Sequence, residues 1–283
     1  MKRILFMAVI LLSACSSFGQ EPADALRYSW NIQGGSARQQ AIGGAMGSLG
    51  GDISATFVNP AGIAFFRTAD FVLTPGYNFL NNKSSYFERT EKIKKSVFTF
   101  GTTGFVGGEG NDKLTNAYSL SVNRMASFGN HILYRGTNNQ SSYSQKFLEE
   151  IQNGNIKDAN AVANNFPFGT SLAFNTYWID TVAGGTSGNF QFQTRAPIAS
   201  GLLQQNEMTT KGGITELALA GASNFRNKLL VGASIGLSFL NYKRDATFIE
   251  ADATNNTANK FDFASFTESL STDGLGLNLR VHR

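Results

Sequence analysis

The sequence predicts an all-β protein: a transmembrane antiparallel up-and-down β-barrel that is incomplete in this chain, with about six strands. Three observations lead to this fold class. Charged residues make up only 16% of the 283 residues while phenylalanine occurs 24 times, whereas soluble domains carry roughly 25% charged residues. Several segments alternate strictly between apolar and small polar residues. Beyond the N-terminus no apolar run approaches the length of a membrane-spanning helix, so the expected spanning elements are strands.

The N-terminus has the three regions of a bacterial secretion signal. Lys2 and Arg3 are basic, 4–12 is apolar, and small residues surround Cys15. We expect residues 1–19 to be removed and the protein to reach the bacterial outer membrane. The order Leu-Ser-Ala-Cys that ends at Cys15 is also the form of a lipoprotein signal, which would place a lipid on this cysteine. The later cut is favoured, because a barrel protein needs no lipid anchor.

The next segment, 20–66, is expected to be a hatch that fills the barrel. Its core, 34–66, is rich in glycine and other small residues, so its backbone can pack closely against surrounding walls. A helix is expected over 37–49, although each internal glycine weakens it by roughly 1 kcal/mol relative to alanine. A turn is expected at 59–62, where Gly62 permits a chain reversal. A glycine-rich stretch is also typical of an ordinary loop; the signal before it and the strands after it favour the hatch.

Residues 67–283 are expected to form the partial barrel, because apolar residues now recur with a period of two. The clearest case is 229–239, where leucine, valine, isoleucine and phenylalanine alternate with glycine and serine. The six expected strands are 70–80, 96–106, 116–126, 213–224, 228–243 and 271–283. The connections between them are alternately long and short, as in a barrel with long external loops and short periplasmic turns. A soluble β-sandwich also alternates along its strands, so the connections favour the barrel.

The longest connection, 127–212, is too long for a passive loop and is expected to have structure of its own. Helical character is expected over 146–163, and the segment 172–180 is either helical or extended. One interpretation is a solvated surface domain with a small core. The other is an external apolar site at the mouth of a pore. The aromatic residues that would form this site are Phe166, Phe168, Tyr177 and Trp178.

The sequence offers no catalytic constellation, so we expect no enzyme, no metal site and no cofactor. The chain has two histidines and one cysteine, which is little material for a metal site or a Ser-His-Asp triad. Its formal charge of +4 falls to +2 without the two basic residues of the signal, and it implies no nucleic-acid partner. A basic cluster lies in the first expected long loop, and it faces either lipopolysaccharide phosphates or only solvent. Its residues are Arg89, Lys92, Lys94 and Lys95.

One segment resembles a known family. The matching residues are Ala37-Arg38, Ala41-Ile42-Gly43-Gly44-Ala45, Leu49-Gly50, Asp52, Ala55-Thr56-Phe57 and Asn59-Pro60-Ala61-Gly62-Ile63-Ala64. In this order they resemble the N-terminal hatch of the FadL-type outer-membrane transporters, the long-chain fatty acid and aromatic hydrocarbon channels. The resemblance implies a fourteen-stranded barrel blocked by the hatch. A hydrophobic ligand would be caught at the outer loops, reach a pocket against the hatch and leave sideways through a gap in the wall.

The resemblance implies passive uptake of a hydrophobic small molecule by a monomeric barrel embedded in outer-membrane lipid and lipopolysaccharide. The hatch residues expected to border the pocket are Phe57, Asn59, Pro60 and Phe65. Six strands are too few to close a barrel, so we expect an N-terminal fragment of the complete protein. The alternative function is a structural or adhesive barrel that binds a host or cell-surface partner through 127–212. Haem capture is a third and weaker hypothesis, because 137–212 contains no histidine.

Overall fold

The computed structural model describes residues 22–29, 34–182, 185, 188–254 and 256–283. The signal expected at 1–19 and the possible lipid attachment at Cys15 lie outside this part of the chain. Within it, no helix combines the length and the apolar character needed to cross a membrane.

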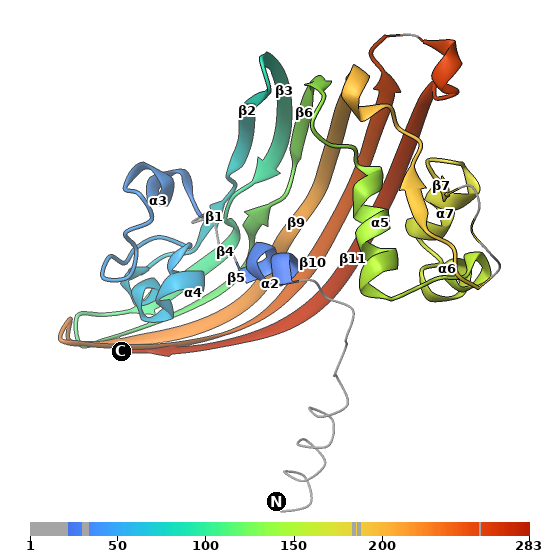
Figure 1. Cartoon of the computed structure of the whole chain (residues 1–283). Helices are drawn as coiled ribbons and strands as arrows, with labels where there is room; N and C mark the ends of the chain where they lie inside the picture. Colours follow the sequence, from blue (N-terminus) through green and yellow to red (C-terminus); the bar gives the residue numbers. More distant parts are fainter. Residues whose placement is uncertain (1–21, 30–33, 183–184, 186–187, 255) are drawn as a thin grey trace, which may run out of the picture.

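The protein is built mainly from antiparallel β-strands, as the sequence predicts (Figure 1). The main sheet has the order β1-β4-β5-β9-β10-β11, and β6 pairs with β9 beyond the end of β5. The strands of this sheet are β1 Asp70–Val72, β4 Thr103–Gly110, β5 Leu114–Ser127, β6 Asn130–Asn138, β9 Leu202–Phe225, β10 Leu229–Asp252 and β11 Phe263–His282. Among the described residues β11 pairs only with β10 and β1 only with β4, so the sheet is open at both edges.

A hairpin of β2 Pro75–Tyr86 and β3 Arg89–Phe100 stands apart from this ladder. In the described residues its strands pair only with each other. One face of the hairpin lies against β6 and β9, where Lys95 Nζ donates to the backbone oxygens of Asn130 at 3.0 Å and Thr210 at 2.8 Å. The hairpin therefore separates from the main sheet at the break between β3 and β4.

Four of the six predicted strands correspond to single strands of the sheet, but 70–80 is broken between β1 and β2 and 96–106 between β3 and β4. The connections predicted between the strands are largely wrong. The expected long loop 81–95 is the body of the β2–β3 hairpin, whose turn is Phe87-Glu88. The longest connection shrinks from 127–212 to 139–201, and 244–270 shrinks to 253–262. The strands continue beyond their apolar parts through polar residues, which resemble loop residues in sequence. Long and short connections therefore do not alternate strictly.

The two faces of the sheet have the composition that the alternation predicts. We call the face that contacts the hatch the inner face and the opposite one the outer face. On the outer face of β10, apolar side chains are exposed at Leu229, Val231, Ile235, Leu237 and Phe239. Beyond Phe239 the same face carries Asn241, Lys243 and Asp245. The inner face is lined by small or polar residues, with Gly232, Ser234 and Gly236 on β10.

The connection 139–201 folds into a helical region with its own core. It contains α5 Ser144–Asn153, α6 Ala159–Asn165, α7 Thr170–Asn175, β7 Ile179–Thr181, β8 Phe192–Thr194 and the 3-10 turn η2 Ile198–Ser200; a similar turn, η3 Thr257–Asn259, follows β10. The helix expected over 146–163 is interrupted at Gly154 and Asn155, where Asn155 takes a φ of 49°. The segment 172–180 is helical first and extended afterwards. The core of the region packs against Phe248 of β10 and Phe266 of β11.

The hatch consists of short helices joined by turns. They are α2 Pro22–Ser29, α3 Ala37–Ala41, α4 Ala55–Val58 and the 3-10 helix η1 Pro60–Phe65. The helix expected over 37–49 ends after Ala41, because Gly43 and Gly44 adopt φ values of 66° and 85°. The predicted reason for Gly62 is wrong, since this glycine does not take a positive φ. It is required by packing: a Cβ there would lie 3.1 Å from Ala55 Cβ and 3.2 Å from the oxygen of Leu49.

Candidate functional site

The hatch packs directly on the inner face of the sheet. Ile53 and Ile63 are fully buried against small side chains of the main sheet, which we call the wall. The wall residues in this cluster are Val106, Ala117, Ala220 and Ala222. One hydroxyl pair also joins the two parts, with Thr56 Oγ1 and Ser119 Oγ 2.7 Å apart. Because the wall residues are small, the hatch backbone can approach the strands closely.

One close approach of the η1 turn to the sheet is at Gly232 on β10. A Cβ at this position would lie 2.4 Å from Ala61 N and 2.6 Å from Pro60 C. We therefore expect Gly232→Val to displace the η1 turn from the wall, at a cost of about 1–3 kcal/mol for overpacking. Limited proteolysis of the folded protein should then cut within 50–66 faster than in the wild type. Gly276→Val is the matched control, because a Cβ at Gly276 meets only Ser238 Cβ, at 3.6 Å; equal cutting of both variants would contradict the contact.

The four predicted hatch residues serve different purposes. Phe57 and Pro60 are buried, whereas the Phe65 side chain is half exposed. Asn59 is a structural residue: its Oδ1 accepts from Ala61 N at 3.2 Å and its Nδ2 donates to Gly47 O at 2.7 Å. Asn59 therefore caps η1 and ties it to the preceding loop. None of the four lines the wall cavity described next.

The wall is interrupted where the hairpin departs from the sheet. The chain breaks between β1 and β2 at Leu73-Thr74, and between β3 and β4 at Gly101-Thr102. These two breaks lie side by side, and each supplies hydrogen-bond partners for the backbone of the other. Gly101 N donates to Thr74 O at 2.8 Å, and Thr74 Oγ1 donates to Thr102 O at 2.8 Å. The β5 strand ends nearby at Ser127. Strand β3 therefore diverges from β5 without pairing with it.

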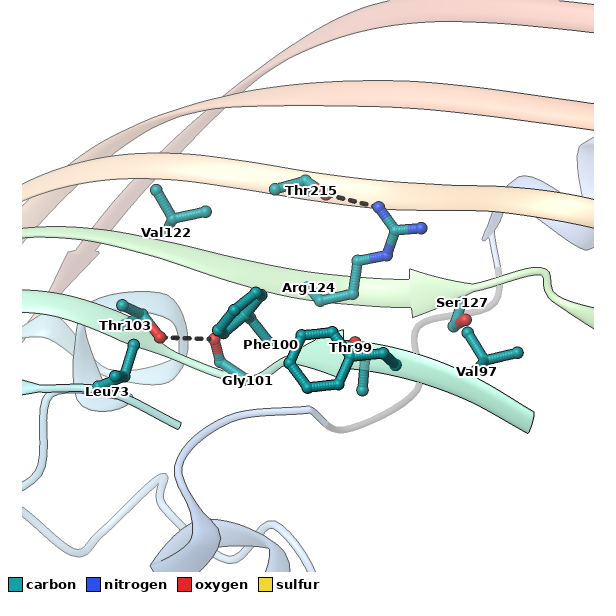
Figure 2. Close-up of a pocket in the computed structure, with 11 residues that line it drawn as sticks. Leu73, Val97, Thr99, Phe100, Gly101, Thr103, Val122, Arg124, Ser127 and Thr215 are labelled. Atoms are coloured by element: carbon teal, nitrogen blue, oxygen red, sulfur yellow. Dashed lines mark hydrogen bonds between the residues drawn. The ribbon is translucent and has the colours of Figure 1, made fainter. Parts of the chain in front are cut away.

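A cavity of about 550 Å³ lies between the diverging strands β3 and β5 (Figure 2). Its lining is mainly apolar, with one cationic side chain. The lining residues are Leu73, Val97, Phe98, Thr99, Phe100, Gly101, Thr103, Val122, Arg124, Ser127 and Thr215. Leu73, Phe98, Phe100 and Val122 belong to the exposed apolar set of the outer face. The size and the apolar lining are those of a small-molecule site.

The glycine pair 34–35 of the hatch covers the inner side of the same break. Thr102 N donates to Gly35 O at 3.2 Å, and a Cβ on Gly101 would lie 2.2 Å from that oxygen. A Cβ on Gly34 would lie 2.6 Å from Arg124 O. The glycine pair 34–35 therefore lies directly against the interruption in the wall. The prediction from sequence missed this contact, although Gly101 within an apolar strand is a recognised sign of close backbone approach.

The four predicted residues of the external apolar site are not brought together as one surface. Trp178 is only 3% exposed and donates through Nε1 to Glu250 Oε1 at 3.2 Å, so it belongs to the core of the helical region. Phe166 is half-buried beside Gly154. Phe168 and Tyr177 are 86% and 67% exposed.

The predicted basic cluster is divided by the structure. Lys95 turns inward to two backbone oxygens, and Arg89 pairs with Glu91 at 2.9 Å. Arg135 also pairs with Glu91, at 2.6 Å, and this hydrogen bond is the main reason that the pKa of Glu91 lies below its usual range. Lys92 and Lys94 remain exposed. Within the described part of the chain, no group of three or more His, Cys, Asp or Glu side chains is arranged to hold a metal ion.

Comparisons with family models, with curated proteins and with solved structures found no match to this chain.

Proposed function

We propose that this protein carries hydrophobic small molecules passively across the bacterial outer membrane, as a member of the FadL-type transporters. The outer face supports membrane placement. Leu229 to Phe239 covers about 34 Å at about 3.4 Å per residue, and a strand tilt of about 45° reduces this to about 24 Å, close to the apolar band of about 25 Å in outer-membrane barrels. The charged residues begin directly beyond it, where a membrane surface would lie. In the proposed barrel the free edge of β11 needs a pairing partner, because unpaired backbone groups are costly in lipid.

The observation that carries the proposal is the interrupted wall. An apolar cavity opens at the outer face, and the glycine pair of the hatch, Gly34 and Gly35, lies on its inner side. A ligand held between hatch and wall would need only a local shift of this glycine pair to reach the membrane through the break. The step from water to lipid provides roughly 0.8 kcal/mol per buried methylene, so no other energy source is required.

Filling the cavity tests this route. Val122→Trp places a bulky ring in the cavity, and we expect oleate uptake by cells that express the protein to fall by about tenfold, because the path between hatch and lipid is occupied. Leu237→Trp is the matched control: Leu237 is as exposed as Val122, 42% against 40%, and lies on the same outer face outside the cavity. Normal uptake by Val122→Trp, with normal amounts of protein in the membrane, would reject the route.

Adhesion through the helical region is the second candidate. Phe168 and Tyr177 are exposed on a region whose core is anchored to the strands, and exposed aromatic residues are typical of binding surfaces. A double change of these residues to serine should abolish attachment to cells and leave oleate uptake unchanged if adhesion is the function. If the double variant keeps both cell attachment and oleate uptake, this candidate is rejected.

A further inference from the structure

The cavity in the wall contains one cationic side chain, Arg124, and it belongs to the outer side. Along β5, Val122 is exposed while Ser121 and Asn123 are buried toward the inner face. Arg124 continues the outward set and lines the cavity together with Val122. In Figure 2 its guanidinium points away from Phe100 and toward Thr215.

The charge of Arg124 has no acidic partner among the described residues. Its Nη1 donates to Thr215 Oγ1 at 2.8 Å, and no salt bridge joins it to a carboxylate in that part of the chain. Its Nη2 lies over Gly213, where a Cβ would approach to 2.4 Å. The hydrogen bond to Thr215 orients the guanidinium, and the absence of a side chain at Gly213 leaves room for it. A guanidinium carries five N–H donors in a planar fork, which suits two oxygens of one anionic group.

The level of Arg124 on the wall identifies the kind of anion. On β5, Arg124 directly follows the exposed apolar residues Tyr118, Leu120 and Val122 of the outer face. On the paired strand β9, its partner Thr215 likewise lies next to the exposed Leu217 and Leu219. In a membrane, this level is where the hydrocarbon region meets the headgroups. An anionic group that reaches Arg124 from outside would therefore be the headgroup of a lipid.

We propose that the cavity holds a membrane lipid with a phosphate headgroup. The phosphate contacts Arg124, and one acyl chain lies along Leu73, Phe98, Phe100 and Val122. This lipid closes the outer side of the break, while Gly34 and Gly35 close the inner side. The proposal rests on the membrane placement proposed above but does not depend on uptake.

Native mass spectrometry of the full chain in detergent tests the site with three probes that share an oleoyl chain: dioleoylphosphatidylglycerol, dioleoylglycerol and oleic acid. We expect the wild type to retain the phosphatidylglycerol about tenfold better than dioleoylglycerol, because a charge-assisted contact to phosphate is lost in the latter. Arg124→Gln should abolish this preference. Val122→Trp should reduce retention of the phosphatidylglycerol while leaving the arginine in place, which guards against a folding defect in the first variant. Lys243→Gln, a cation outside the cavity on the same face, should retain the lipid normally.

Equal retention by the wild type and Arg124→Gln would overturn the proposal, as would an equal loss in Lys243→Gln. Retention of oleic acid as strong as that of the phosphatidylglycerol, with the same dependence on Arg124, would assign the site to a free acid and overturn the lipid assignment. Oleate uptake is measured separately in the same variants. In Val122→Trp, loss of lipid retention with normal uptake would support the lipid site and reject the transport route, whereas normal lipid retention with lost uptake would support the route and reject the lipid site.

Discussion

Replacing Glu216 with alanine is expected to lower the free energy of unfolding by about 3–5 kcal/mol, the cost of leaving a buried charge without its partner. Glu216 on β9 is fully buried on the inner face. Its carboxylate accepts two hydrogen bonds from Arg280 of β11, at 2.6 Å and 3.0 Å, and one from Asn278 at 2.9 Å. Strand β10 lies between β9 and β11, so this pair links the outermost strand to the rest of the wall.

A double-mutant cycle separates the pair from general damage to the wall. Glu216→Ala combined with Arg280→Met should recover much of the loss, because no unpaired charge remains. Urea unfolding in detergent, followed by tryptophan fluorescence, gives the four free energies. A double variant as unstable as the sum of the two single variants would show that Glu216 and Arg280 are not coupled.

Replacing Glu250 with alanine is expected to release the helical region from the wall, at a cost of about 3–6 kcal/mol, because several buried donors lose their acceptor together. Glu250 is fully buried near the C-terminal end of β10. It accepts from Ser142 Oγ at 2.5 Å, Tyr143 N at 3.0 Å, Trp178 Nε1 at 3.2 Å and Gln204 Nε2 at 2.7 Å. Three of these donors lie in the 139–201 connection.

Fluorescence of Trp178, with Trp30 replaced by phenylalanine, reports this release as a red shift of the emission. Glu250→Gln should show a smaller shift, because it keeps one acceptor oxygen. Glu207→Ala removes an exposed glutamate of the neighbouring strand β9, which contacts His131, and should leave the emission unchanged. An unshifted spectrum for Glu250→Ala would mean that the aromatic contacts alone hold the region.

The faces of the sheet could be predicted from the sequence because strand side chains alternate with a period of two, so that successive residues lie on opposite faces. At 229–239 and 275–281 that pattern is strong enough to determine which residues are exposed. The ends of the strands could not be predicted. In 81–95 the residues are mostly polar, so pairing of the backbone in a hairpin leaves no apolar signal.

The site was only partly predictable for a different reason. Asn59 and Pro60 belong to a motif visible in the sequence, and the structure gives them a local role in shaping η1. The break in the wall depends on contacts between distant segments, such as Gly35 with Thr102, and nothing in the sequence near either residue indicates the other. Trp178 resembles a surface aromatic in sequence; its burial depends on Glu250, 72 positions away.

Photolabelling with a diazirine analogue of oleic acid tests the central claim most directly, namely that the ligand passes through the break in the wall. The full chain would be labelled in outer membranes, with and without excess oleate, and the labelled peptides identified by mass spectrometry. Our account predicts labelling of 98–101 and 122–127 that oleate competes away. Labelling spread evenly over the outer face, as strong at Leu237 and Leu277 as in the cavity and unaffected by oleate, would contradict it.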